Sequence, residues 1–156
     1  MHMRLVAVGD RQPAWVDAAF SDYIGRLPRV WKFALCTQAT SRRRKQGNVA
    51  AAKQEEGERI LEALRPAERA VMLDEGGRQL SSVELADAVA DWQRDARDVC
   101  FVIGGPDGID KPCLQRADFC WSLSRLTLPH GLARVVFAEQ LYRASTLHEG
   151  HPYHRA

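Results

Sequence analysis

The chain of 156 residues lacks several features that would assign it to a class at once. No apolar run approaches the roughly 20 residues that a membrane-spanning helix requires. The N-terminus does not show the charged, apolar and small-residue segments that follow one another in a secretory signal. We therefore expect a cytoplasmic protein that binds no membrane.

Cysteine is sparse, and none of the four cysteines belongs to a Cys-x-x-Cys pair. Cys36 and Cys100 lie inside apolar runs, as small core residues do. This spacing indicates neither a disulfide framework nor a zinc site. The segment 148–151 begins and ends with histidine, but Glu149 and His151 are one residue too close for a zinc-binding helix. We expect no metal.

Common nucleotide and nucleophile motifs are absent as well. No Gly-x-x-x-x-Gly-Lys-Ser/Thr run exists, and the residues after the first apolar segment do not form Gly-x-Gly-x-x-Gly. These absences disfavour ATP hydrolysis and an ordinary dinucleotide-dependent dehydrogenase. No Gly-x-Ser-x-Gly elbow is present, so the sequence does not favour a serine hydrolase either.

The formal net charge of +2 is too small to establish a nucleic-acid partner, but one stretch concentrates positive charge. Four consecutive cations are followed by Gln-Gly-Asn: Arg42, Arg43, Arg44 and Lys45. We expect a mobile basic loop here. A solvated loop is one interpretation, and a loop that binds RNA or DNA phosphates is the other, because clustered Arg and Lys displace counterions.

Apolar segments of strand length alternate along the chain with amphipathic segments of helix length. This alternation predicts an α/β fold with a mostly parallel sheet, in a single domain over residues 1–156. Strands are expected over 3–9, 30–37, 69–73, 98–103 and 120–123. Helices are expected over 13–26, 49–64, 111–117 and 132–147, with a further helix that begins at Ser81 or Ser82.

Two loops in the last third of the chain are typical of ligand binding. The apolar run 99–103 ends at the turn 104–108, Gly-Gly-Pro-Asp-Gly, and the run 120–123 enters a Ser/Thr/Pro loop. Ligands bind beyond the carboxyl ends of strands in open α/β sheets. Adjacent glycines allow close approach to the backbone, although a plain turn is the alternative. Asp74, after another strand, is open to a ligand role or a turn role.

Several motifs, spread over the whole chain and densest after residue 103, closely resemble those of the ribosomal RNA large subunit methyltransferase H family. Its members are SPOUT-class methyltransferases. The most specific segments are Ile-Gly-Gly-Pro-Asp-Gly at 103–108, Trp-Ser-Leu-Ser at 121–124, Leu-Thr-Leu-Pro-His at 126–130, Ala-Glu-Gln-Leu-Tyr-Arg-Ala at 138–144 and His-Pro-Tyr-His-Arg at 151–155.

This resemblance implies a fold, a cofactor and a substrate. The C-terminal part of the sheet would form a trefoil knot, and the active form would be a homodimer. The cofactor would be S-adenosylmethionine. The reaction would place a methyl group on N3 of a pseudouridine in large-subunit (23S) ribosomal RNA, within the assembled ribosome.

The resemblance also implies site residues. The cofactor would be held by Leu73, Gly105, Ser124, Arg125, Leu126, Thr127, Leu128 and Pro129. Gly105 is expected to be glycine because a Cβ would block the cofactor. The candidates for catalysis are Arg143, Tyr153, His154 and Arg155. They would stabilise charge on the uracil ring, take its proton or orient the base.

Further expectations concern RNA and the partner subunit. His130 and the basic loop would bind RNA, and the tail would complete the pocket of the other subunit. The sequence leaves two alternatives open. One is another SPOUT activity, such as ribose 2′-O or transfer RNA methylation, which the tail motif disfavours. The other is a ribosome assembly factor without catalysis, which the complete set of cofactor loops disfavours.

Overall fold

The computed structural model describes residues 1–154, which form one five-stranded sheet with the strand order β2-β1-β4-β3-β5. All four strand pairings are parallel, which confirms the predicted α/β class. The strands are β1 (Met3–Val8), β2 (Ala34–Gln38), β3 (Arg69–Gln79), β4 (Val99–Ile103) and β5 (Phe119–Ser122).

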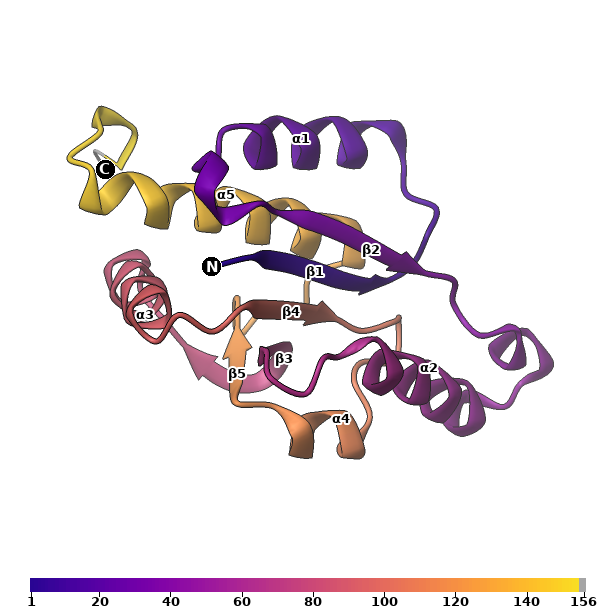
Figure 1. Cartoon of the computed structure of the whole chain (residues 1–156). Helices are drawn as coiled ribbons and strands as arrows, with labels where there is room; N and C mark the ends of the chain where they lie inside the picture. The colour runs from indigo at the N-terminus through magenta and orange to yellow at the C-terminus, as the bar shows by residue number, and fades with distance from the viewer. Residues whose placement is uncertain (155–156) are drawn as a thin grey trace.

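Residues 1–154 also contain five α-helices and three short 3₁₀ helices, of which α5 and η3 follow the last strand. The α-helices are α1 (Ala14–Gly25), α2 (Val49–Ala63), α3 (Ser82–Arg94), α4 (Lys111–Arg116) and α5 (His130–His148). The 3₁₀ helices are η1 (Arg29–Trp31), η2 (Arg42–Gln46) and η3 (Pro152–His154). Figure 1 shows α1 and α5 over one face of the sheet and α2 and α4 over the other.

The central strand β4 is apolar and buried at every position, as expected for a strand covered on both faces. Alternate side chains of β1 enter two separate cores. One core lies with α1, α3 and α5 and contains Met3, Leu5 and Ala7. The other lies with α2 and α4 and contains Val6 and Val8.

Side-chain caps fix where two helices begin. The Asn48 side chain accepts a hydrogen bond from the Ala51 amide at 3.0 Å, which starts α2 at the expected residue. Ser81 and Glu84 form a reciprocal capping box, in which each side chain accepts from the other's backbone N–H. The cap of α3 is therefore Ser81.

Three segments differ from the expectation. The start of the strand expected over 30–37 is the 3₁₀ helix η1, which buries Trp31, so β2 is shorter. β3 continues through the expected loop at 74–77, and a Cβ on Gly77 would lie 2.7 Å from the Cys120 backbone of β5. The expected mobile basic loop is the 3₁₀ helix η2, whose cap Ser41 accepts from the Arg43 amide at 3.2 Å.

Candidate active site

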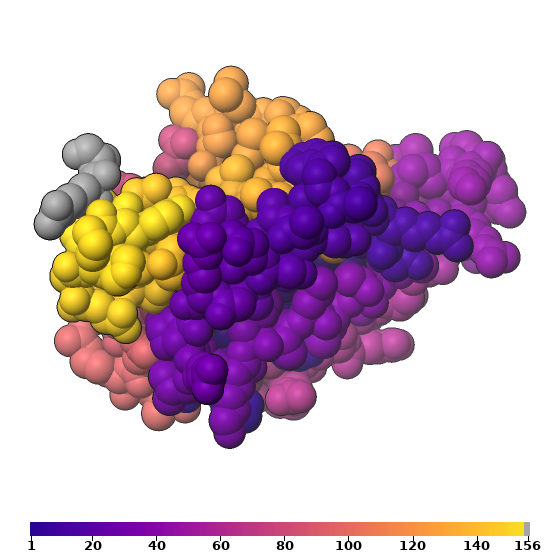
Figure 2. Space-filling view, turned by 90° about the horizontal axis from the view of Figure 1, so that it is seen from above, coloured from indigo at the N-terminus to yellow at the C-terminus, as the bar shows by residue number. Residues whose placement is uncertain are grey.

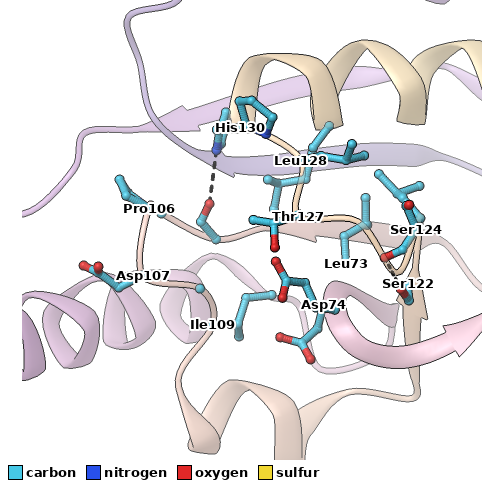
Figure 3. Close-up of a pocket in the computed structure, with 18 of the residues that line it drawn as sticks. Leu73, Asp74, Pro106, Asp107, Ile109, Ser122, Ser124, Thr127, Leu128 and His130 are labelled. Atoms are coloured by element: carbon cyan, nitrogen blue, oxygen red, sulfur yellow. Dashed lines mark hydrogen bonds between the residues drawn. The ribbon is translucent and has the colours of Figure 1, made fainter.

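A cavity of about 750 Å³ opens beyond the carboxyl ends of β4 and β5 and beside residues 73–75 in the middle of β3 (Figure 3). This volume is in the range of small-molecule sites. Its walls come mainly from segments 73–75, 103–109 and 122–130, which are far apart in sequence. Seven of the eight predicted cofactor residues line it: Leu73, Gly105, Ser124, Leu126, Thr127, Leu128 and Pro129. Arg125 lies in the same loop but does not line the cavity.

Two serines shape the loop between β5 and α5. The Ser122 hydroxyl donates to the Ser124 carbonyl at 3.0 Å, and the Ser124 hydroxyl accepts from the Leu126 amide at 2.9 Å. These bonds hold the loop backbone against the cavity. Leu126 projects outward, with 74% of its surface exposed.

The turn after β4 has little room for side chains. The Gly108 amide donates to the Gly105 carbonyl at 2.9 Å, and a Cβ on Gly104 would lie 2.9 Å from the Gly108 backbone. A Cβ on Gly105 would collide with the carboxylate of Glu56 from α2. The structure gives a reason for this glycine that the sequence did not reveal, because the missing Cβ makes room for Glu56.

His130 begins α5 and closes one wall of the cavity. Its Nδ1 lies 3.1 Å from the Gly104 carbonyl oxygen, and its Nε2 lies 2.9 Å from a terminal nitrogen of Arg134. Because a guanidinium only donates, Nε2 accepts and Nδ1 carries the proton. Burial, with the nearby charge of Arg134, lowers the pKa of His130. His130 is thus a neutral link whose two nitrogens are both engaged within the chain.

Arg134 is almost completely buried, and it also donates to the Gly9 carbonyl at 2.7 Å. It ties the end of β1 to the start of α5. Burial lowers the pKa of Arg134, and within residues 1–154 its Nε has no hydrogen-bond partner.

Carboxylates dominate the charged part of the cavity lining. Asp74, Glu75 and Asp107 line it together with a single cation among the described residues, Lys53. Asp74 and Thr127 point toward one another across the cavity (Figure 3). Asp74 also accepts from the Gly76 amide at 2.9 Å, as the turn interpretation expects. It lines the cavity as well, as a ligand role requires. Such a lining suits a ligand with positive charge or hydroxyl donors.

The C-terminal tail packs on the far end of α5. The Tyr153 hydroxyl donates to Glu139 at 3.0 Å, and Arg143 donates to the same carboxylate at 2.7 Å. The Arg143 guanidinium lies 5.1 Å from the centre of the Tyr153 ring, and the Tyr142 ring lies 4.7 Å from it. The structure therefore brings Arg143 and Tyr153 together.

The other two catalytic candidates belong to the same tail. His154 is half-buried, and its Nδ1 has no hydrogen-bond partner within residues 1–154. Arg155 lies outside the described residues.

The tail cluster and the cavity lie at opposite ends of α5. Arg143 lies 13 positions after His130 in the helix, which corresponds to about 20 Å at 1.5 Å per residue. Figure 1 shows η3 at the C-terminal end of α5, on the side away from the carboxyl end of β4. Figure 2 shows the yellow C-terminal turn and the purple region around η2 at opposite ends of one face. Within one chain, the cofactor candidates and the catalytic candidates do not meet.

The basic segment is not uniform. Arg42, Arg43 and Lys45 are exposed, and Arg43 pairs with Glu55 at 3.3 Å. Arg44 is different, because its guanidinium donates to two carboxylates of other elements, those of Glu56 and Asp107. Three of the four cations therefore face solvent.

Two features are absent from the described residues: a metal-binding cluster and a membrane-spanning helix. No group of three or more His, Cys, Asp or Glu side chains within 1–154 is placed to hold a metal ion. No described helix is both long enough and apolar enough to cross a membrane.

Comparison with known proteins assigns the chain. A family model described as "Predicted SPOUT methyltransferase" matches residues 1–154. The chain belongs to the SPOUT methyltransferase family. The resemblance found in the sequence is thus confirmed, and the cavity is the candidate active site of a SPOUT methyltransferase.

Individual relatives agree over the full length of this SPOUT methyltransferase. Proteins named "Ribosomal RNA large subunit methyltransferase H" are 46% identical in Thioalkalivibrio sulfidiphilus, over 99% of both chains, and 47% identical in Teredinibacter turnerae, over 99% of this chain and 100% of the relative. A solved probable methylase family protein from Haemophilus influenzae is 12% identical with a TM-score of 0.56, over 99% of this chain and 70% of that one. That structure supports the fold.

Three polar residues of the site were missed in the sequence, although periodicity carried a signal for two of them. Glu56 lies four residues after buried Ala52 and four before buried Ile60, on the inner stripe of α2. Arg134 lies four residues before buried Ala138. A charged residue on an apolar stripe indicates a buried ion pair or hydrogen-bond network. Glu139 had no such signal.

Proposed function

We propose that this chain uses S-adenosylmethionine to methylate N3 of a pseudouridine in large-subunit (23S) ribosomal RNA, on assembled ribosomes in the cytoplasm. The observation that carries the proposal is the match between residues and geometry: the loop segments of the resemblance form one cavity. The full-length relatives named for ribosomal RNA methylation support the substrate. A knotted single domain over 1–156 is part of the proposal.

The cavity residues fit this cofactor. The cofactor has a positive sulfonium, a ribose with two hydroxyls, and an adenine that needs backbone partners. Asp74 and Glu75 provide acceptors, Thr127 provides a hydroxyl, and the loop 124–129 provides backbone amides and carbonyls beside apolar side chains. Leu73, Ile103 and Leu128 would cover the adenine faces. Arg125 would contribute only its backbone.

When bound, the sulfonium supplies an activated methyl group. The chain then has to position N3 in line with that group and receive the N3 proton. His154 is the candidate to receive it, because an imidazole can take up a proton near neutral pH. Arg143, with Arg155, would stabilise negative charge on the uracil carbonyls, and Tyr153 would orient the ring.

A homodimer reconciles this chemistry with the separation along α5. The tail of one subunit would complete the cavity of the other. Apolar side chains are exposed where the N-terminal ends of α1 and α5 meet: Trp15 is 55% exposed and Leu132 is 42% exposed. Burying them against a second copy would stabilise such a dimer.

RNA binding is assigned to the exposed cations of η2. Arg42, Arg43 and Lys45 face solvent, where phosphates can approach them. His130, whose nitrogens are engaged within the chain, shapes the cavity wall beside the RNA base.

The direct test is methyl transfer from labelled S-adenosylmethionine to ribosomes of a strain that lacks this enzyme, followed by nucleoside mass analysis. We expect 3-methylpseudouridine, and we expect its loss in the variant Tyr153→Phe with His154→Ala. Transfer to ribose or to transfer RNA would replace the proposal with another SPOUT activity. Cofactor binding without methyl transfer to any RNA acceptor would favour an assembly factor without catalysis. The absence of cofactor binding would favour the same alternative.

A further inference from the structure

Arg44 differs from the other cations of η2 in its contacts. Its two terminal nitrogens donate to the Glu56 carboxylate at 3.0 and 3.3 Å, and its Nε donates to Asp107 at 2.6 Å. Only 22% of its side chain is exposed. The guanidinium is therefore part of an internal network that joins η2, α2 and the turn after β4.

Glu56 makes this network costly to break. Its side chain is 3% exposed, and its carboxylate also accepts from the Ser41 amide at 2.8 Å. Arg44 provides the positive charge that faces it. A buried carboxylate without its cation is strongly disfavoured. Arg44 is consequently unable to turn toward an RNA phosphate without leaving Glu56 uncompensated.

The network also touches the cavity turn at two points. Glu56 lies against Gly105, where a Cβ would collide with it, and Arg44 binds the side chain of Asp107. Gly105 and Asp107 both line the cavity. One ion-pair network thus fixes both the backbone and a side chain of the turn relative to α2.

We propose that Arg44 is a positioning residue for the cofactor turn and does not bind RNA phosphate. The inference rests on the proposed function. It divides the basic segment by role: Arg42, Arg43 and Lys45 attract RNA, whereas Arg44 holds the turn 104–108 in the shape that accepts the cofactor.

Two measurements on the full-length protein separate these roles. Calorimetry without RNA gives the S-adenosylmethionine Kd, and ribosome binding at several salt concentrations gives the salt slope. For Arg44→Met we expect a Kd weaker by roughly tenfold and an unchanged salt slope. For Arg42→Ala we expect the slope to fall by about 1. Arg94→Met, which removes an exposed ion pair on α3, is the matched control for cofactor Kd.

A double-mutant cycle shows whether Arg44 acts through the turn. Asp107→Asn removes the negative charge from the contact with the turn and leaves Glu56 paired with Arg44, so it can be measured even if Arg44→Met does not fold. If the link is shared, Arg44→Met combined with Asp107→Asn weakens cofactor binding no more than the weaker-binding single variant. Arg44→Lys keeps a charge beside Glu56 but loses the planar guanidinium that reaches both carboxylates, and we expect weaker cofactor binding there as well.

Three results would overturn the inference. The first is a wild-type cofactor Kd in Arg44→Met or Arg44→Lys, and the second is a lower salt slope in either variant. The third is fully additive effects in the double-mutant cycle. Each would show that Arg44 does not act as a positioning residue for the turn alone. If the unaltered protein does not bind S-adenosylmethionine in calorimetry, the proposed function fails first and the inference falls with it. The two failures are therefore distinguishable.

Discussion

The two ends of α5 are built on opposite principles. At its N-terminal end, His130 and Arg134 are tied to the carbonyls of Gly104 and Gly9, and the surrounding loops enclose a cavity. At its C-terminal end, Tyr153 and Arg143 meet at the partly buried carboxylate of Glu139. One end lines a cavity, and the other gathers polar and charged side chains in a cluster.

Under the proposed function, the cavity would hold the cofactor and the tail would supply the groups that act on the RNA base. Neither end would then suffice for methyl transfer. The span of α5 keeps the two apart within a subunit, so the proposal relies on a second subunit to bring them together. Changes at the two ends should therefore affect different measurements.

The largest effect is expected from the tail. Tyr153→Phe with His154→Ala should lower methyl transfer by about 10² to 10⁴-fold, because general acid–base groups contribute on that scale. The cofactor Kd should remain within about twofold, because the altered groups are assigned to the RNA base and not to the cofactor. Calorimetry and a labelled-methyl assay measure the two quantities. A weaker cofactor Kd would show that the tail also takes part in cofactor binding.

Subunit mixing sharpens the same contrast. Equal amounts of a tail variant and a cavity variant, unfolded and refolded together, should recover about a quarter of wild-type activity, because half of the random dimers contain one intact site. Each variant refolded alone is the control. Activity that stays at the level of the separate variants would rule out a site shared between subunits.

A change at the cavity end is expected to have the next largest effect. In Gly104→Ala, the new Cβ would meet the Gly108 backbone at 2.9 Å and the Ile109 side chain at 2.7 Å, so the turn has to shift. We expect a loss of about 1–3 kcal/mol in unfolding free energy and weaker cofactor binding. Gly25→Ala, where no atom lies within 4 Å, is the matched control and should not lower stability. Urea unfolding and calorimetry provide the comparison.

Glu139→Gln tests the contacts at the C-terminal end of α5, and its expected effect is smaller than that of Gly104→Ala. Burial first, then hydrogen bonds with Tyr23 and Glu139, raise the pKa of Tyr153. Removing the Glu139 charge should therefore lower the pKa of Tyr153, as followed by phenolate absorbance. The lost pair with Arg143 is partly exposed and should cost no more than about 1 kcal/mol. Glu149→Gln, an exposed acid nearby, is the control; equal titration curves for both variants would contradict the contact.

The smallest effect concerns pH. Burial lowers the pKa of His130 below the ordinary histidine value of 6.5, so the unfolded chain takes up a proton before the folded chain does. This contribution to stability is full above pH 6.5 and is lost as pH falls through the lowered pKa. Urea unfolding between pH 5 and about 7.5 should show a shallower pH dependence for His130→Gln than for the wild type. Parallel curves would show that His130 does not titrate in this range.

Local pattern was enough to predict most of the sheet, because β4 consists of five buried apolar residues and α2 begins at a recognisable Asn48 cap. The continuation of β3 was not predictable from Gly76-Gly77, which looks like a turn until β5 lies against it. The cavity loops were identified by resemblance. The assignment of the tail to the site stays a prediction, and its packing on α5 depends on contacts that no local pattern contains.

The strand order has a consequence for the timing of synthesis. β4 lies between β1 and β3 but is made after both, so a nascent chain that ends before residue 99 contains two parts of a sheet with the central strand missing. Neither part closes its own core until β4 emerges, and the cavity walls at 122–130 follow later still. A growing chain is therefore expected to stay open to chaperones and proteases for about two-thirds of its synthesis, and to gain ligand binding only near the end.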